Sequence, residues 1–194
     1  MTRPTIFVVD DDERVRAALA LLLASNGYQT LGFPTAESFL RSIQPDSFGC
    51  VLLDVRLEEM SGLELQSELN RIQRRIPVIV MSGFPDVRVV VKAMQSGAIG
   101  FLEKPIDEGS LLRLVTGALD KHASIREVES RLEALTPREI EVMQRLVEGQ
   151  TVVQIAEEFG ISRKTVDVHR GRVLQKANVK NVPELGALLR RLDA

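Results

Sequence analysis

The sequence predicts two domains, an α/β domain built on a five-stranded, doubly wound parallel sheet and a small all-α domain of four helices. Over roughly the first 120 residues, short apolar runs alternate with helical stretches, which is typical of βαβ units. Several of these runs end abruptly in a charged residue. About the last 60 residues show helix caps and helical periodicity instead.

The best-defined strand is Cys50–Asp54, an apolar run that ends in a carboxylate. A run of this length, bounded by Gly49 and a polar segment, is typical of a strand that is buried on both faces. The other predicted strands are Ile6–Val9, Gln29–Phe33, Pro77–Met81 and Ile99–Leu102. The helices predicted around them are Glu13–Ser25, Thr35–Ile43, Leu63–Arg74, Asp86–Ser96 and one that begins near Glu108.

The C-terminal helices are predicted mainly from their caps. Thr136-Pro137-Arg138-Glu139 combines a cap residue, proline at the first helical position and glutamate three residues after the cap. This helix is predicted to end near Glu148, and the next three span Val152–Phe159, Arg163–Ala177 and Pro183–Leu192. We therefore expect a first domain over residues 1–121, a helical linker over 122–134 and a second domain over 135–194.

Composition excludes several classes of protein. Aromatic residues make up 4% of the chain and Trp is absent, which leaves little material for stacking on single-stranded nucleic acid. Cys50, the single cysteine, rules out a disulfide framework. No apolar run approaches the ~18 residues of a membrane span, and the start lacks a signal-peptide core. We expect a cytoplasmic protein without membrane contact. Residues 160–194 contain eight Lys and Arg but three Asp and Glu. Their net positive charge suits binding to the phosphate backbone of a nucleic acid.

Polar side chains follow the predicted strands where each strand ends. The carboxyl ends of parallel strands meet at one edge of a sheet, which would bring together Asp10, Asp11, Asp54, Ser82 and Lys104. Carboxylates this close repel one another unless a cation lies between them, and Mg²⁺ prefers such oxygen ligands. A carboxylate beside Mg²⁺ can attack a phosphoryl group, while a lysine and a hydroxyl stabilise the transferred oxygens. Singly, such residues are common as caps and turns; their coincidence at four strand ends indicates phosphoryl chemistry.

Residues 5–121 resemble the receiver domain of two-component response regulators, which has the CheY-like or flavodoxin-like fold. The matching segments are Val8-Val9-Asp10-Asp11, Leu53-Asp54, Met60-Ser61-Gly62, Met81-Ser82-Gly83, Gly97-Ala98 and Phe101-Leu102-Glu103-Lys104-Pro105. The resemblance implies that Asp54 accepts a phosphoryl group from a phosphohistidine of a cognate sensor histidine kinase. The implied Mg²⁺ ligands are Asp10, Asp11, Asp54 and the backbone carbonyl of Arg56.

The resemblance also implies that Ser82 and Phe101 are switch residues and that Lys104 contacts the phosphoryl group. It further implies a cis Lys104–Pro105 peptide bond. One departure is Glu58, which stands where the family usually has proline. The extra carboxylate either raises metal affinity or slows the approach of the phosphoryl group, and the residues do not decide between the two.

The helix predicted over Asp86–Ser96 contains four valines that cannot all face one core. Val89 and Val91 lie about 200° apart on a helix, so at least one valine should be exposed. Scattered exposed valines are ordinary on protein surfaces. The other interpretation is a partner surface, because receivers of this kind are expected to form homodimers through this helix and the following strand after phosphorylation. Val91 is the candidate contact.

Residues 154–166 have the spacing of a helix–turn–helix motif, with Gly160 at the turn and Ser162 as the cap of the next helix. That helix would present these residues to a DNA major groove: Lys164, Thr165, Val168, His169, Arg170 and Arg172. A helical bundle with a solvated basic face would account for the charges alone. However, Leu135–Leu192 resembles the LuxR-type tetrahelical domain, including Leu135-Thr136-Pro137-Arg138-Glu139 and Thr165-Val166-Asp167-Val168-His169.

Asp167 and Gly171 stand where some relatives place lysines, which predicts low phosphate affinity for a single domain and a need for dimerisation. Together the two resemblances imply a response-regulator transcription factor similar to the FixJ/NarL class. In this interpretation phosphorylation of Asp54 promotes dimerisation and binding to double-stranded promoter DNA, with RNA polymerase as a further contact. No turnover of an external substrate is expected.

Two other functions fit parts of the same sequence. The first is a receiver-controlled module that binds protein or RNA, which a salt-dependent DNA gel shift would distinguish. The second is an aspartyl-phosphate hydrolase, which uses a similar set of residues around Mg²⁺. Those enzymes carry the nucleophile at the end of the first strand in an Asp-x-Asp setting and the acidic pair later, whereas the order here is reversed. Turnover of phosphate monoesters would identify such an enzyme.

Overall fold

The computed structural model describes residues 3–72, 75–84 and 86–192. The chain divides into two compact units, Met1–Ala123 and Ser124–Ala194. Helix α5, Glu108–Glu133, contributes residues to both units, so the division falls inside the segment predicted as a helical linker.

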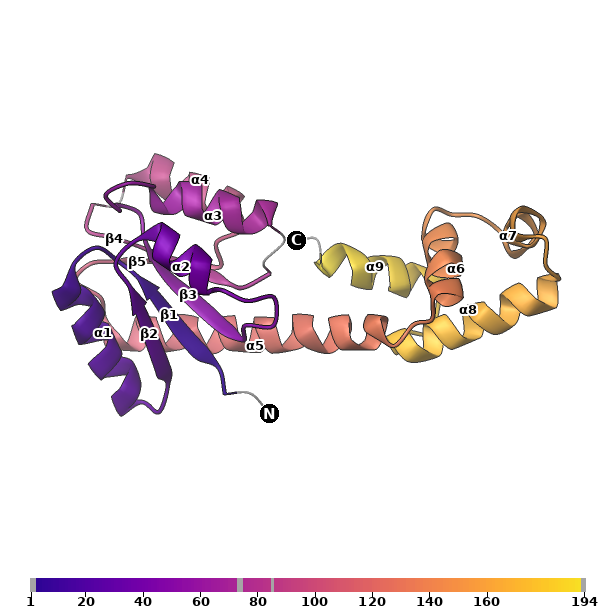
Figure 1. Cartoon of the computed structure of the whole chain (residues 1–194), viewed down its shortest axis with the longest axis horizontal. Helices are drawn as coiled ribbons and strands as arrows, with labels where there is room; N and C mark the ends of the chain where they lie inside the picture. Colours follow the sequence, from indigo (N-terminus) through magenta and orange to yellow (C-terminus); the bar gives the residue numbers. More distant parts are fainter. Residues whose placement is uncertain (1–2, 73–74, 85, 193–194) are drawn as a thin grey trace. The chain divides into compact units, whose positions relative to one another are not determined.

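The N-terminal unit contains a parallel sheet of five strands in the order β2-β1-β3-β4-β5, which confirms the predicted doubly wound α/β fold (Figure 1). The strands are β1 (Thr5–Val9), β2 (Gln29–Phe33), β3 (Gly49–Asp54), β4 (Val78–Ser82) and β5 (Gly100–Glu103). Strand β3 lies at the centre, paired with β1 and β4, and all of its residues are buried. Its burial explains why its residues are apolar up to Asp54.

Helices cover both faces of the sheet (Figure 1). They are α1 (Glu13–Ser25) and α5 on one face and α2 (Ala36–Ser42), α3 (Gly62–Arg71) and α4 (Val87–Gln95) on the other. Along β1, Phe7 and Val9 join the core beneath α2, α3 and α4, whereas Ile6 and Val8 join the core beneath α1 and α5. The two-residue period of the strand therefore supplies two cores from one apolar run.

Several element ends differ from the predicted ones. Strands β4 and β5 each begin one residue later than predicted. For β4 the reason is that Pro77 lacks an N–H and contributes only its carbonyl, which accepts a hydrogen bond from Val51. Asp86 and Ser96 are the caps of α4 and lie outside it. Helix α3 ends at Arg71, and its predicted end at Arg74 lies outside the described residues.

The C-terminal unit contains the helices α6 (Pro137–Val147), α7 (Val152–Phe159), α8 (Arg163–Ala177) and α9 (Val182–Leu192). Thr136 and Glu139 form the predicted capping box at the start of α6. Gly160 adopts φ +63° between α7 and α8, a left-handed conformation that favours glycine at this tight turn. Within the described part of the chain, no helix is both long and apolar enough to cross a membrane.

An ion pair between a buried carboxylate on α6 and a partly exposed lysine on α8 fixes the start of α6 against α8. Glu139 is 1% exposed, and its Oε2 accepts hydrogen bonds from Lys176 Nζ at 2.7 Å and from the Thr136 N–H at 2.9 Å. Lys176 Nζ also donates to the carbonyl of Ala134 at 2.9 Å. The bond from Lys176 and then the bond from Thr136 lower the pKa of Glu139 from 4.5 to about 2.

Because the folded-state pKa of Glu139 is depressed, its stabilisation is present above pH 4.5 and is lost as the pH falls through about 2. We expect Glu139→Gln to destabilise the C-terminal unit by about 1–3 kcal/mol at neutral pH. The reason is that Lys176 Nζ and the Thr136 N–H lose the carboxylate that accepts both of their hydrogen bonds. Hydrogen exchange of the α6 and α8 amides in the full chain measures this loss.

Glu141→Gln is the matched control, since Glu141 lies on the same helix and forms an exposed pair with Arg138. It should change stability by less than about 1 kcal/mol. Equal protection in the two variants at neutral pH would contradict the role given to Glu139.

Candidate functional site

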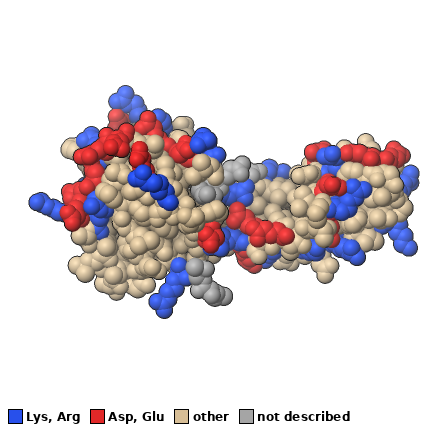
Figure 2. Space-filling view, in the orientation of Figure 1, with Lys and Arg blue, Asp and Glu red and all other residues tan. Residues whose placement is uncertain are grey.

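Three aspartates converge at the carboxyl edge of the sheet. Asp10 directly follows β1, Asp11 is the next residue and Asp54 ends β3. One carboxylate oxygen of each lies within 4.8 Å of the others, which confirms the predicted cluster. Figure 2 shows that Asp and Glu side chains also gather on the surface around this edge of the N-terminal unit. Hard oxygen donors at this spacing fit a divalent cation such as Mg²⁺.

Lys104 joins two of the aspartates. It follows β5, and its Nζ donates to Asp10 Oδ2 at 2.7 Å and to Asp54 Oδ2 at 2.8 Å. The Lys104–Pro105 peptide bond is cis, as the family resemblance implied. Burial lowers the pKa of Lys104, but the hydrogen bonds to both aspartates outweigh it and raise that pKa above its usual value. Burial also raises the pKa of Asp10, which the bond from Lys104 opposes only in part.

Backbone groups hold the second oxygens of these carboxylates. Asp10 is fully buried and its Oδ1 accepts a hydrogen bond from the Asp12 N–H at 3.0 Å. Asp54 Oδ1 accepts from the Arg56 N–H at 3.3 Å. A Cβ atom at Gly62 would lie 2.1 Å from the Asp54 carbonyl oxygen, so only glycine allows α3 to start this close to β3. The backbone bonds therefore fix the orientation of the Asp10 and Asp54 carboxylates.

The two predicted switch residues lie on neighbouring strands. Ser82 ends β4 and is 2% exposed; its hydroxyl donates to the Phe84 carbonyl and accepts from the Phe84 N–H, both at 3.2 Å. Phe101 lies in β5, half-buried against the core beneath α2, α3 and α4. Ser82 thus stands at the same edge as Asp54 with its hydroxyl bonded to the β4–α4 loop. The Arg56 carbonyl as a metal ligand stays a prediction.

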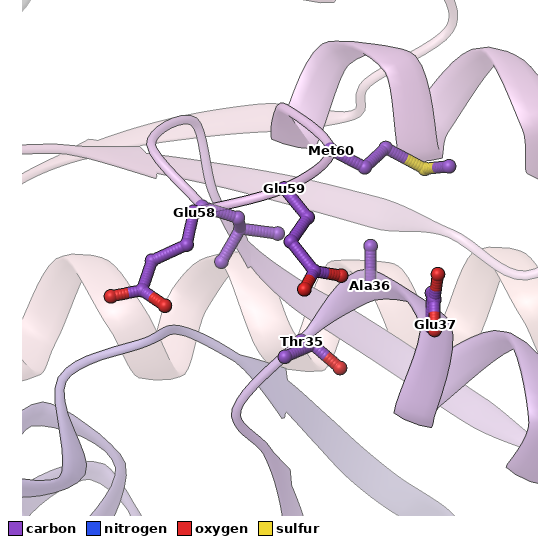
Figure 3. Close-up of a pocket in the computed structure, with 7 residues that line it drawn as sticks. Thr35, Ala36, Glu37, Glu58, Glu59 and Met60 are labelled. Atoms are coloured by element: carbon purple, nitrogen blue, oxygen red, sulfur yellow. The ribbon is translucent and has the colours of Figure 1, made fainter.

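Glu58 lies over a separate pocket (Figure 3). This pocket of about 120 Å³ lies between the start of α2 and the β3–α3 loop and is lined by Thr35, Ala36, Glu37, Leu57, Glu58, Glu59 and Met60. Among the described residues, the carboxylate cluster consists of Asp10, Asp11 and Asp54 and does not include Glu58. Its carboxylate therefore does not join the cluster directly.

Helix α4 presents an exposed apolar face, which we call the α4 face and define as Val87, Val91 and Met94. Their exposed fractions are 75%, 47% and 46%. The spacing of four and three residues places them on one side of the helix. The prediction that at least one valine of this helix is exposed is confirmed, and Val91 is one of them.

Helix α8 follows α7 in the predicted helix–turn–helix order, and Val166 is buried in the core between them. Its candidate DNA-binding residues comprise four exposed ones, Lys164, Thr165, Val168 and Arg172, and two half-buried ones, His169 and Arg170. In this unit, Lys and Arg lie along α8 while Asp and Glu gather near α7 (Figure 2). One helix therefore offers both positive charge and short side chains to a partner.

Three further contacts near these sites were not predicted. Arg16 of α1 donates to the backbone carbonyls of Asp10 and Asp11. The Arg56 guanidinium stacks on the Phe84 ring at 4.9 Å, joining the loops after β3 and β4. Gln66 of α3, which is 1% exposed, donates to two carbonyls at the end of α4. In the sequence, such a contact could be predicted only from a polar residue on an otherwise apolar helix face. Of the three residues, only Gln66 clearly shows this pattern.

Both units match known families. Residues 6–116 match the family described as "Response regulator receiver domain", and residues 133–188 match "Bacterial regulatory proteins, luxR family". The chain therefore belongs to the response regulators, and it combines a receiver domain with a LuxR-type domain.

Relatives extend the likeness to nearly the full chain. Nodulation protein W of Bradyrhizobium diazoefficiens is 37% identical over 191 residues, which cover 95% of this chain and 84% of that protein. Transcriptional regulatory protein FixJ of Azorhizobium caulinodans is 40% identical over 187 residues, covering 93% and 89%.

Two solved structures are similar over almost their whole length. The response regulator StyR has a TM-score of 0.63 and 39% identity, covering 97% of this chain and 99% of that one. Full-length FixJ from B. japonicum has a TM-score of 0.58 and 35% identity, covering 99% and 98%.

Proposed function

We propose that the chain is a transcription regulator whose DNA binding is controlled by phosphorylation of Asp54. The observation that carries this proposal is the convergence of Asp10, Asp11, Asp54 and Lys104 in a chain that also contains a LuxR-type domain. A sensor histidine kinase is the donor, as membership of the response regulators implies.

In the phosphoryl transfer, an oxygen of Asp54 forms a bond to phosphorus while the bond from phosphorus to the kinase histidine nitrogen breaks, and the product is an acyl phosphate. Lys104 Nζ already lies 2.8 Å from Asp54 Oδ2, so it can turn to a transferred oxygen with little movement. Asp10, Asp11 and the Arg56 carbonyl would hold Mg²⁺ together with Asp54. When bound, the cation supplies positive charge that stabilises the transferred oxygens.

The change at Asp54 reaches the surface through Ser82 and Phe101. Ser82 exchanges its bonds with Phe84 for one to the phosphoryl group, which frees the loop before α4. Phe101 then turns inward, and the α4 face forms a homodimer interface around Val91. The exposed apolar side chains of this face support the proposal, because burying them against a second copy removes them from water.

Dimerisation brings two copies of α8 to paired half-sites on double-stranded promoter DNA. Arg and Lys side chains of α8 contact phosphates, while Thr165 and Val168 are short enough to approach base edges. The luxR-family match of residues 133–188 favours DNA over the protein- or RNA-binding alternative. The Azorhizobium caulinodans relative is named a transcriptional regulatory protein, which fits a regulator better than a hydrolase.

Asp54→Asn should abolish labelling by acetyl phosphate and phosphate-dependent dimer formation, because the amide cannot form the acyl phosphate. Size-exclusion chromatography with light scattering, with and without acetyl phosphate, measures the dimer. Asp107→Asn is the control, since it changes an exposed carboxylate and keeps a residue able to accept the Ser110 N–H. An unchanged phosphate-dependent dimer in the Asp54 variant would refute the mechanism.

Val91→Asp should weaken the phosphorylated dimer at least tenfold, because it places a charge in an apolar interface. Labelling of Asp54 by acetyl phosphate should be unaffected. Leu21→Asp provides the matched control, as Leu21 is 75% exposed on α1, away from the α4 face. Sedimentation velocity of the phosphorylated variants gives the dimer constants, and wild-type dimerisation of the Val91 variant would exclude this residue from the interface.

Lys164→Ala should reduce the slope of log K against log salt by about 1, because one phosphate contact is lost. Lys180→Ala, an exposed lysine outside α8, should leave the slope unchanged. Fluorescence anisotropy of the phosphorylated chain on duplex DNA from upstream of its gene measures both. Tighter binding to RNA of the same sequence would instead favour an RNA-binding module.

A further inference from the structure

Arg16 forms two hydrogen bonds that the phosphoryl transfer does not use. Its Nη1 donates to the carbonyl oxygen of Asp10 at 2.7 Å and to that of Asp11 at 2.9 Å. Within the described chain, none of its hydrogen bonds goes to a carboxylate, although three aspartates lie at this edge of the sheet. One guanidinium nitrogen therefore binds the backbone of the loop that carries two of the proposed metal ligands.

The stem of this side chain is also held in place. Arg16 lies in the second turn of α1, and its backbone N–H donates to the Asp12 carbonyl at 3.1 Å. Its Cδ lies 3.5 Å from where a Cβ of Gly32 on β2 would be, an ordinary van der Waals distance, so the stem runs alongside β2 at this point. Packing of the stem reduces the entropy lost when the guanidinium binds the two carbonyls.

The two proposed ligands, Asp10 and Asp11, depend on the Arg16 hydrogen bonds to different extents. The carboxylate of Asp10 is fully buried and is bonded directly by the Asp12 N–H and by Lys104. Asp11 is exposed, and its carbonyl is the atom by which Arg16 holds it. The direction in which the Asp11 side chain leaves the loop therefore follows from the backbone conformation that Arg16 fixes.

We propose that Arg16 is a positioning residue for the divalent cation: it fixes the Asp10–Asp11 backbone so that both carboxylates face Asp54. This inference rests on the metal site of the proposed function. Two effects of the guanidinium oppose each other, because its charge repels a cation while its bonds preorganise the ligands. Three carboxylates at this edge outweigh the single guanidinium charge, and the guanidinium bonds fix the loop that carries two of them, so preorganisation is expected to prevail.

Isothermal titration calorimetry with MgCl₂ on the full chain tests the sign of this effect. Groups that orient metal ligands typically contribute about 10–100-fold to affinity, and we expect Arg16→Met to weaken Mg²⁺ binding about tenfold. Arg14→Met is the matched control: Arg14 is exposed on the same helix and its variant should bind Mg²⁺ like the wild type. Equal or tighter binding by the Arg16 variant would overturn the proposal.

A second readout separates positioning from a general loss of structure. The rate of labelling by acetyl phosphate is measured against Mg²⁺ concentration. Arg16→Met should raise the half-saturating concentration about tenfold, by the same factor as the binding constant, and reach the wild-type plateau at saturation. A lower plateau with an unchanged half-saturating concentration would overturn the proposal.

Arg16→Lys keeps the test decisive if the methionine variant does not fold. It retains the charge, but lysine Nζ lies one bond closer to the backbone than Nη1 and does not reach both carbonyls from the same position. A several-fold weakening is therefore expected, and wild-type affinity would overturn the proposal. If the wild-type chain itself binds no Mg²⁺, the metal site of the proposed function fails, and this inference fails with it. If the wild type binds Mg²⁺ and both variants match it, only the role of Arg16 fails.

Discussion

Repulsion among Asp10, Asp11 and Asp54 is the constraint around which the N-terminal unit is built. Carboxylate oxygens of all three lie within 4.8 Å of one another, and Asp10 is fully buried. Like charges at such distances are tolerated only where cations and hydrogen-bond donors offset them. Lys104 is placed to do this from the end of β5, across the sheet from β1. The parallel sheet brings these distant residues to one edge, and its two apolar cores hold them there.

The same edge connects the site to α4, and the two ends of this helix are held differently. At its C-terminal end, Gln66 of α3 donates to the carbonyls of Ala93 and Ser96, and Asn70 donates to Ser96 as well. At its N-terminal end, Asp86 caps the helix and pairs with Arg88, both within the same segment. Among the described residues, the side-chain hydrogen bonds from α3 to α4 therefore lie at its C-terminal end, whereas the α4 face begins at the other end.

The sequence was sufficient to predict the sheet, the carboxylate cluster and the capping box of α6, because each depends on local patterns. An apolar run that ends in Asp54 marks both a strand and the position of its last side chain. The contacts of Arg16, Gln66 and the Arg56–Phe84 pair were not predictable in this way. They join side chains to backbone carbonyls or rings on other elements, and such partners are fixed only once the elements are packed.

The composition of α8 explains why control at Asp54 can act on DNA binding at all. A guanidinium nitrogen of Arg170 lies 3.8 Å from a carboxylate oxygen of Asp167 on the same helix, and both side chains are partly exposed. Such a pair contributes only about 0.3–0.5 kcal/mol to the helix, yet it reduces the net positive charge that α8 offers to phosphates. Under the proposed function, a single copy is then expected to bind DNA weakly. When two copies are joined, the second binds at a high effective concentration, so a switch that only changes dimerisation can still change promoter occupancy by orders of magnitude.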